Sequence, residues 1–174
     1  IEYRGKLAFF LAKTLFRFGN SAVFQTNDAK NWFPQAIRKK SVIIYNPIGE
    51  IFYNTRLNEV RSGIVTVGSQ RVHFPGQISN VPFSLRNARL FVLSSDIEGM
   101  PNALMEAMAI GLPCISTDCP CGGPRMLFPK SIAAYLVPVG DSETLSERIL
   151  TVLTDRELEI FLAQECKKAS FEFE

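Results

Sequence analysis

The chain of 174 residues is long enough for one domain with a substantial core, and 47% hydrophobic against 21% charged residues is an ordinary globular composition. A formal net charge of +2 is too small to indicate nucleic acid as a partner. No apolar run reaches the length needed to cross a bilayer. The chain opens at Ile1 without a secretory signal, and we expect it to be a fragment whose targeting information has been removed.

The first predicted element is a helix over residues 4–18 with a basic face. Lys6, Lys13 and Arg17 lie together on this face, at spacings of seven and four, and Phe10 lies beside them. Such a face suits an anionic membrane surface. It also suits a packed helix with a solvated basic edge, which is the interpretation that we favour.

Short elements follow in the next part of the chain. Residues 22–24 predict a strand, Thr26 caps a helix through about Phe33, and residues 42–44 predict a second strand. Residues 49–62 are predicted to be irregular. Beyond them, residues 64–67 and 71–74 are two β-rich runs on either side of a Gly-Ser turn signal, which taken alone predicts a hairpin.

The rest of the chain is organised around residues 90–113. A helix over residues 81–88 comes first, and the apolar run at 90–93 predicts a buried parallel strand. After a polar loop, Pro101 fits the first position of a helix, and Gly111 fits its left-handed C-terminal cap. This order is strand, loop and helix.

The predicted helix has two different faces. One is an apolar stripe that would lie on a sheet, made of the i,i+4 pairs Ala103/Ala107 and Leu104/Met108. Asn102 and Glu106 form a second i,i+4 pair on another side, and Glu98 precedes the helix. Two carboxylates beside a helix N-terminus, which attracts anions, suit a nucleotide sugar.

The last part of the chain predicts a strand and two helices. The strand covers residues 113–116. Asp141 caps a helix to about Leu153, and Thr154 with Glu157 forms a capping box for a helix to about Lys168. Residues 171–174 are a short stub.

Residues 98–113, EGMPNALMEAMAIGLP, resemble the E-x7-E signature of the family-4 retaining glycosyltransferases, which have the GT-B fold. Residues 116–125, STDCPCGGPR, are similar to the next loop of that family, and residues 136–141 to its following strand end. The resemblance covers roughly residues 21–165. It implies an α/β fold with a Rossmann-like parallel sheet and helices on both faces, the C-terminal half of a GT-B fold.

The resemblance also implies a donor site. Glu98 would contact the hydroxyls of the donor sugar as the candidate catalytic residue, by positioning and not by attack. Glu106 would contact the ribose, and backbone N–H groups near Asn102 and Ala103 would face the diphosphate. The alternative is that both carboxylates are solvated helix-end groups. The implied donor-binding residues are Glu98, Gly99, Met100, Pro101, Asn102, Ala103, Glu106, Gly122, Gly123 and Arg125.

Three members of this set, Gly122, Gly123 and Arg125, have open alternatives. Gly122 and Gly123 bring the backbone close to a ligand, or they form a plain tight turn. Arg125 adds a positive charge near the phosphates, or it pairs with a surface acid. The family usually has Glu where Met126 stands and a glycine-containing stretch at residues 130–134.

The resemblance divides the chain at a hinge over residues 45–48. Residues 1–45 would be the end of a first, acceptor-side domain, and residues 46–174 the donor-binding domain. The usual acceptor site would be absent, so the fragment alone is expected to be inactive. Because Ser69 stands where the family has a phosphate-binding Arg and no matching Lys follows, we expect some tens of residues to be missing near 68–71, either deleted or left out of the numbering. The strands at 64–67 and 71–74 would then run parallel, which needs a crossover.

No metal or cofactor is expected. Ser95-Asp96 has no second acid at D-x-D spacing, so the charge of the leaving group would be met by the helix dipole and backbone N–H groups. Cys114 is predicted to be a core residue, and Cys119 and Cys121 are loop residues far from the single histidine, His73, so zinc is not indicated. The thiols are expected to be reduced.

The implied function is transfer of a hexose from a nucleotide diphosphate sugar, with a UDP-sugar favoured, to a glycan or lipid-linked acceptor with retention of configuration. The partners would be the nucleotide sugar and the acceptor, and the protein would be cytoplasmic with peripheral membrane contact at the inner face. The alternative is a non-catalytic nucleotide-sugar or phosphosugar binding module. A nicotinamide oxidoreductase is disfavoured because the G-x-G-x-x-G fingerprint is absent. The oligomeric state stays open.

Overall fold

The computed structural model describes Thr14, residues 18–67 and residues 80–173. The predicted helix over residues 4–18, apart from Thr14 and Phe18, and the predicted strand and missing segment near residues 68–74 lie outside these ranges. The elements in chain order are β1 (Ala22–Phe24), α2 (Asn27–Asn31), α3 (Gln35–Arg38), β2 (Ser41–Ile43), α4 (Glu50–Asn54), β3 (Ile64–Val67), α5 (Val81–Leu85), β4 (Leu90–Leu93), α6 (Asn102–Ile110), β5 (Cys114–Thr117), α7 (Gly123–Leu127), the 3₁₀ helix η1 (Lys130–Tyr135), β6 (Leu136–Val137), α8 (Ser142–Thr154), α9 (Arg156–Ser170) and the 3₁₀ helix η2 (Phe171–Phe173).

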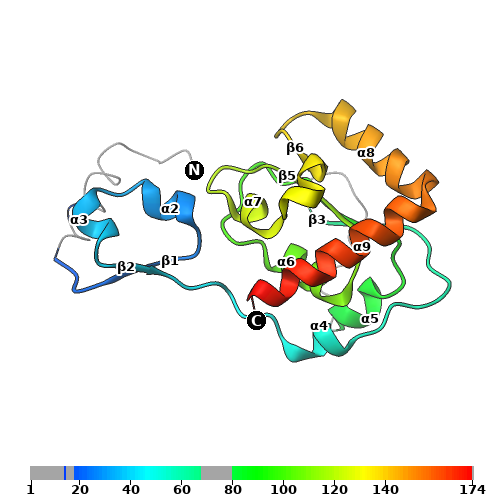
Figure 1. The fold of residues 1–174 in the computed structure, drawn as a ribbon, viewed down its shortest axis with the longest axis horizontal. Helices are drawn as coiled ribbons and strands as arrows, with labels where there is room; N and C mark the ends of the chain where they lie inside the picture. Colours follow the sequence, from blue (N-terminus) through cyan, green and yellow to red (C-terminus); the bar gives the residue numbers. More distant parts are fainter. Residues whose placement is uncertain (1–13, 15–17, 68–79, 174) are drawn as a thin grey trace.

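The described strands form two parallel sheets. β1 pairs with β2, and β3-β4-β5-β6 form a second sheet in which every pairing is parallel. Figure 1 shows the β1–β2 pair with α2 and α3 at one end of the molecule, joined by an extended segment to the larger sheet and its helices. The predicted α/β fold with a parallel sheet is therefore confirmed.

Both faces of the larger sheet are covered. All four residues of β4 and all four of β5 are buried. Because successive side chains of a strand point to opposite faces, this burial requires packing on both sides. Such continuous apolar burial is why a run of four apolar residues predicted β4 correctly.

Among the described residues, those that pack on the smaller sheet lie on one of its faces. Ala22 and Phe24 are buried with Ile37 of α3 in a small second core. Val23 and its strand partner Val42 are each more than half exposed, and so is Ile44, two residues after Val42. The other face of β1–β2 is therefore an apolar surface open to solvent.

α6 is more deeply buried than its predicted stripe. Leu104, Ala107 and Met108 are buried as expected, but so are Met105 and Ile110. The reason is that α6 contacts the sheet on one side and α4, α5 and α9 on others. Pro101 is the N-cap and not the first helical residue, and Gly111 forms the predicted left-handed cap with φ 94°.

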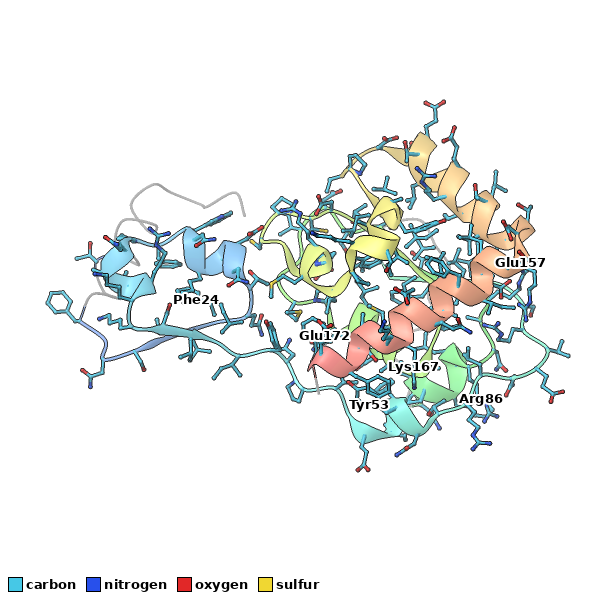
Figure 2. All side chains as sticks on the ribbon, viewed as in Figure 1. Phe24, Tyr53, Arg86, Glu157, Lys167 and Glu172 are labelled. Atoms are coloured by element: carbon cyan, nitrogen blue, oxygen red, sulfur yellow. The ribbon has the colours of Figure 1, made fainter. Side chains whose placement is uncertain are left out.

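The prediction that residues 49–62 are irregular is wrong at α4. This short helix is fixed by contacts distant in sequence: the Tyr53 hydroxyl donates to the carbonyl of Ser170 at 3.0 Å, and Lys167 Nζ donates to the carbonyl of Tyr53 at 3.1 Å. Lys167 also donates to the carbonyl of Ala109 in the last turn of α6, where a cation is favourable. Figure 2 shows Lys167 and Tyr53 together where α9 passes α4.

Other boundaries differ by small amounts. β2 and β5 start at Ser41 and Cys114, so the predicted strands are displaced by one residue. The helix capped by Thr26 ends at Asn31, and α3 follows Pro34 without having been predicted. The terminal segment, predicted as a stub, is the η2 turn, in which Phe173 is buried and packs edge-on against Tyr45 with ring centroids 4.9 Å apart.

The predicted capping box at Thr154 is wrong by one residue. Asp155 is the N-cap of α9, because its carboxylate accepts from the backbone N–H of Leu158 at 3.0 Å. Thr154 ends α8, and its hydroxyl donates back to the carbonyl of Leu150 at 2.8 Å. Asp141 caps α8 as predicted, accepting from the N–H of Thr144 at 3.0 Å.

This assignment of the cap predicts unequal effects of two neighbouring substitutions. Asp155→Ala should lower the free energy of unfolding by about 1 kcal/mol, because the first turn of α9 loses its side-chain acceptor. Thr154→Ala should change it by less than about 0.5 kcal/mol. Urea denaturation of both variants measures the difference, and a larger loss for Thr154→Ala would contradict the assignment.

Two further expectations concern membranes and thiols. Within the described ranges no helix has the length and apolar character to cross a membrane. All four cysteines are buried and unpaired, and Cys114 lies in the main core as predicted.

Candidate functional site

The predicted site lies at the carboxyl edge of the larger sheet. β4 and β5 are parallel neighbours, so the loops that follow them, 94–101 and 118–122, lie at the same edge. α6 and α7 both begin there. In open α/β sheets this is the edge at which ligands bind.

Glu98 is held by a residue of its own loop. It is half-buried, and its Oε1 accepts a hydrogen bond from the Ser95 hydroxyl at 2.7 Å. A hydrogen bond to an ionised acceptor is stronger than a neutral one. The Glu98 carboxylate is therefore restrained before any ligand binds.

Ser95 is in turn held by two residues at and just after the end of β5. Its carbonyl accepts from the Thr117 hydroxyl at 2.5 Å and from the Cys119 thiol at 3.0 Å. Thr117 is 4% exposed and Cys119 is 0% exposed. Burial raises the pKa of the Cys119 thiol, which keeps it protonated and able to donate.

Gly123 lies against the loop that carries Glu98. A Cβ atom at Gly123 would lie 1.6 Å from the carbonyl oxygen of Gly99 and 3.0 Å from Cδ of Pro101. Cys121 and Gly122, with φ of 76° and 69°, form the left-handed turn that brings Gly123 to this position. The close approach that glycine permits here is to the protein's own backbone.

The N-terminus of α6 is tied to the segment that joins the two sheets. The side-chain amide of Asn46 donates to Oδ1 of Asn102 at 2.6 Å. Gln25, just after β1, donates to Oδ1 of Asn46 at 2.5 Å. Met100 and Pro101, just before α6, are both buried. Their contact with a donor stays a prediction.

The first backbone bonds of α6 define where an anion can bind. The N–H groups of Leu104 and Met105 donate to the carbonyl of Pro101, both at 3.1 Å. Those of Asn102 and Ala103 precede this pair, at positions that helices leave for capping groups or anions. Glu106 is half-buried one turn later, and burial raises its pKa.

Arg125 pairs with acids in this structure. Its guanidinium contacts Oδ2 of Asp118 at 2.7 Å and Oδ2 of Asp28 at 3.2 Å, and the hydrogen bond to Asp118 raises the pKa of Arg125. Asp28 belongs to α2 and also lies against Gly122, where a Cβ would be 2.3 Å from its Oδ2. Of the two alternatives for Arg125, the structure contains the acid pair, and this pair joins α2 to the site.

The structure thus brings together several predicted residues. Gly99 and Pro101 contact Gly123, Glu98 is held in the adjoining loop, and Asn102 begins α6. That Glu98 and Glu106 open into one cleft stays a prediction. A shallow apolar groove of about 480 Å³ lies at the other end of α6, near Gly111 and Lys167, and is not this cleft. Within the described part of the chain, no three His, Cys, Asp or Glu residues are placed to hold a metal ion.

Sequence reasoning missed the supporting residues Ser95, Thr117, Asn46 and Asp28. Ser95 and Thr117 follow or end buried strands, and small polar residues at strand ends were a usable signal. Asn46 and Asp28 act through partners 56 and 97 residues away, and no local pattern indicates such contacts.

Comparison with known proteins decides the family. The family model described as "Glycosyl transferases group 1" matches residues 28–155, which is most of the chain. The chain belongs to the group 1 glycosyltransferases. The resemblance of residues 98–113 to glycosyltransferases is thereby confirmed.

Curated relatives of this glycosyltransferase domain are similar over part of its length. The N-acetyl-alpha-D-glucosaminyl L-malate synthase of Bacillus anthracis is 32% identical over 102 residues, 59% of this chain and 26% of the relative. The UDP-Gal:alpha-D-GlcNAc-diphosphoundecaprenol alpha-1,3-galactosyltransferase of Escherichia coli is 30% identical over 98 residues, 56% of this chain and 24% of the relative. The chain therefore spans about a quarter of the length of these relatives.

Solved structures agree with the fold of a glycosyltransferase. Anabaena HepE in complex with UDP has a TM-score of 0.80 and 15% identity, over 98% of this chain and 64% of that chain. HepE in complex with UDP-glucose has a TM-score of 0.77 at 16% identity, with the same coverage. At this identity the likeness concerns the fold, and it confirms the predicted GT-B fold class.

Proposed function

We propose that this chain binds a nucleotide diphosphate sugar, most favourably a UDP-sugar, at the N-terminus of α6. The observation that carries the proposal is the arrangement of the signature: Glu98, held by Ser95, lies at the carboxyl edge of the sheet immediately before α6, with Glu106 one turn along the helix. HepE, which has the same fold, was solved with UDP and with UDP-glucose, and this supports the ligand class.

The site residues take the following roles in the proposal. Glu98 orients hydroxyls of the donor sugar, and Glu106 accepts hydrogen bonds from the ribose. The backbone N–H groups of Asn102 and Ala103 bind the diphosphate at the positive end of the α6 dipole. Because these groups meet the leaving-group charge, the proposed chemistry is electrostatic stabilisation without a metal ion.

The two glycines and the arginine take supporting roles. Gly123 holds the loop of Glu98 and Gly99 in place by close contact, and Gly122 lies against Asp28. Arg125 contributes positive charge at the edge of the site while paired with Asp28 and Asp118.

For the whole protein we propose transfer of a hexose to a glycan or lipid-linked acceptor with retention of configuration. Residues 46–174 would be the donor-binding domain and residues 1–45 the end of an acceptor-side domain, so the isolated chain would be inactive. A cytoplasmic location with membrane contact at the inner face fits the lipid-linked acceptor in the name of the Escherichia coli relative. The competing hypothesis, a binding module without turnover, differs in one outcome: the intact protein would not release UDP from any nucleotide sugar in the presence of acceptors.

The proposed ribose contact predicts a loss of UDP affinity in Glu106→Ala. Loss of the acceptor should cost about 1–3 kcal/mol, a weakening of roughly 5- to 150-fold in isothermal titration calorimetry. Glu147→Ala is the matched control, since Glu147 is an exposed glutamate within α8 and should leave the affinity unchanged.

The pH dependence of the same experiment is a second check. Because burial raises the pKa of Glu106, this carboxylate becomes protonated at a higher pH than an ordinary glutamate. The difference in UDP affinity between the wild type and Glu106→Ala should therefore narrow as the pH falls from 7 toward 5. Equal affinity of the wild type and the variant at pH 7 would remove Glu106 from the site.

A further inference from the structure

We propose that Ser95 is a positioning residue that sets the direction of the Glu98 carboxylate toward the donor sugar, and that Thr117 and Cys119 hold Ser95 for this task. The inference rests on the proposed function, because it assumes that Glu98 contacts the sugar. It adds residues to which the predicted signature assigned no role.

The first step is the contact between Ser95 and Glu98. A serine hydroxyl has one proton, and here it is donated to Oε1 of Glu98 at 2.7 Å. With one carboxylate oxygen held in this way, the rotation of the side chain is restricted. The remaining acceptor capacity of the carboxylate then has a defined direction in which to meet a sugar hydroxyl.

The second step is the anchoring of Ser95 itself. The Thr117 hydroxyl and the Cys119 thiol donate to the same carbonyl, that of Ser95, at 2.5 and 3.0 Å. Both donors are buried at the end of β5 and just beyond it, in the interior of the sheet edge. Since buried hydrogen bonds are costly to break, the main chain at Ser95 is fixed relative to the sheet.

The third step is the effect on binding. Glu98 lies in a loop directly before Gly99, where the backbone alone does not determine the direction of a long side chain. A carboxylate that is already oriented binds a sugar without losing rotational freedom on association. Removal of the Ser95 hydroxyl should therefore weaken the interaction with the sugar and spare the interaction with UDP.

The test compares UDP with UDP-glucose for variants of this chain in calorimetry. For Ser95→Ala we expect UDP affinity within about twofold of the wild type. UDP-glucose affinity should fall by roughly five- to tenfold, because the Glu98 side chain must then lose its rotational freedom on association. Ser95→Thr keeps a hydroxyl and should restore UDP-glucose binding. Thr117→Val removes one of the two hydrogen bonds that anchor Ser95. Like Ser95→Ala, it should leave UDP affinity nearly unchanged and weaken UDP-glucose binding. Ser94→Ala, an exposed neighbour, is the control and should resemble the wild type.

The outcomes separate this inference from the function on which it rests. If Ser95→Ala binds UDP-glucose as tightly as the wild type does, the positioning role is wrong and the proposed function is unaffected. If Ser95→Ala loses UDP and UDP-glucose affinity equally, Ser95 supports the fold of the loop and not the sugar contact, which also overturns the inference. A wild-type chain that binds neither ligand contradicts the proposed function itself.

Discussion

Gly123→Ala should destabilise the protein by about 3 kcal/mol and also disturb the proposed donor site. The added Cβ would lie 1.6 Å from the carbonyl oxygen of Gly99, well inside any van der Waals contact. This clash can be relieved only if the backbone moves, because the obstructing atoms are the Gly99 carbonyl and the ring of Pro101 and not the end of a flexible side chain. Such overpacking costs about 1–3 kcal/mol and occasionally more, a large share of the 5–15 kcal/mol that stabilises a typical domain.

Urea denaturation and UDP calorimetry on the same sample measure both effects. Gly49→Ala is the matched control, since a Cβ there would meet no atom nearer than 3.6 Å and its φ of −64° suits any residue. We expect Gly49→Ala to change the free energy of unfolding by less than about 0.5 kcal/mol. If Gly123→Ala is equally mild, the loop of Glu98 and Gly99 is not held by this contact.

Glu159→Ala should cost about 3 kcal/mol of stability, because it leaves the largely buried Arg61 and the partly buried Arg89 without their counter-ion. Glu159 is fully buried in α9, and its carboxylate contacts Arg61 at 3.1 Å, Arg89 at 2.6 Å and Arg156 at 2.7 Å. Arg61 is itself largely buried, and burial lowers its pKa while Glu159 opposes that change. Glu157→Ala, an exposed carboxylate two residues earlier, is the control and should have little effect.

Ionisation of Glu159 makes the free energy of unfolding depend on pH. Burial opposes ionisation of Glu159, but hydrogen bonds from Arg89 and Arg156 outweigh it, and the net effect lowers the pKa of Glu159. The contribution of ionised Glu159 to the free energy of unfolding is therefore fully present above its unfolded-state pKa, about 4.5. It is lost as the pH falls through the lower folded-state pKa. Urea denaturation between pH 7 and pH 3 should show a steeper loss for the wild type than for Glu159→Gln. Parallel curves for the two proteins would contradict this coupling.

Local sequence patterns were sufficient for the elements that build the site. The apolar run of β4 and the stop at Gly111 are short-range signals, and they predicted the strand and the helix end correctly. The spacing of Glu98 and Glu106 is also a short-range signal, and their place in a donor site stays a prediction. α4 could not be predicted in this way. Its five residues form a helix because Tyr53 and Lys167 connect it to α9, more than a hundred residues later.

The support of the candidate site was also beyond local reasoning. Glycine at position 123 was recognised as a close-approach residue, but the identity of the neighbour, Gly99, depends on how two loops meet in space. The link from Asn46 to Asn102 depends on the path of the chain between the two sheets. Glycine and asparagine are common in loops, so the residue type alone does not reveal these contacts. They follow only from the tertiary arrangement.

The uncovered face of the β1–β2 pair will govern how the isolated chain behaves at high concentration. Val23, Val42 and Ile44 present branched aliphatic side chains to water in a parallel sheet, a type of sheet that proteins normally cover on both faces. Exposed apolar patches of this kind promote self-association. Sulfate and other strongly hydrated salts, which strengthen apolar contacts, will precipitate the chain more readily than chloride does. Crystallisation and NMR samples therefore need conditions that weaken apolar association.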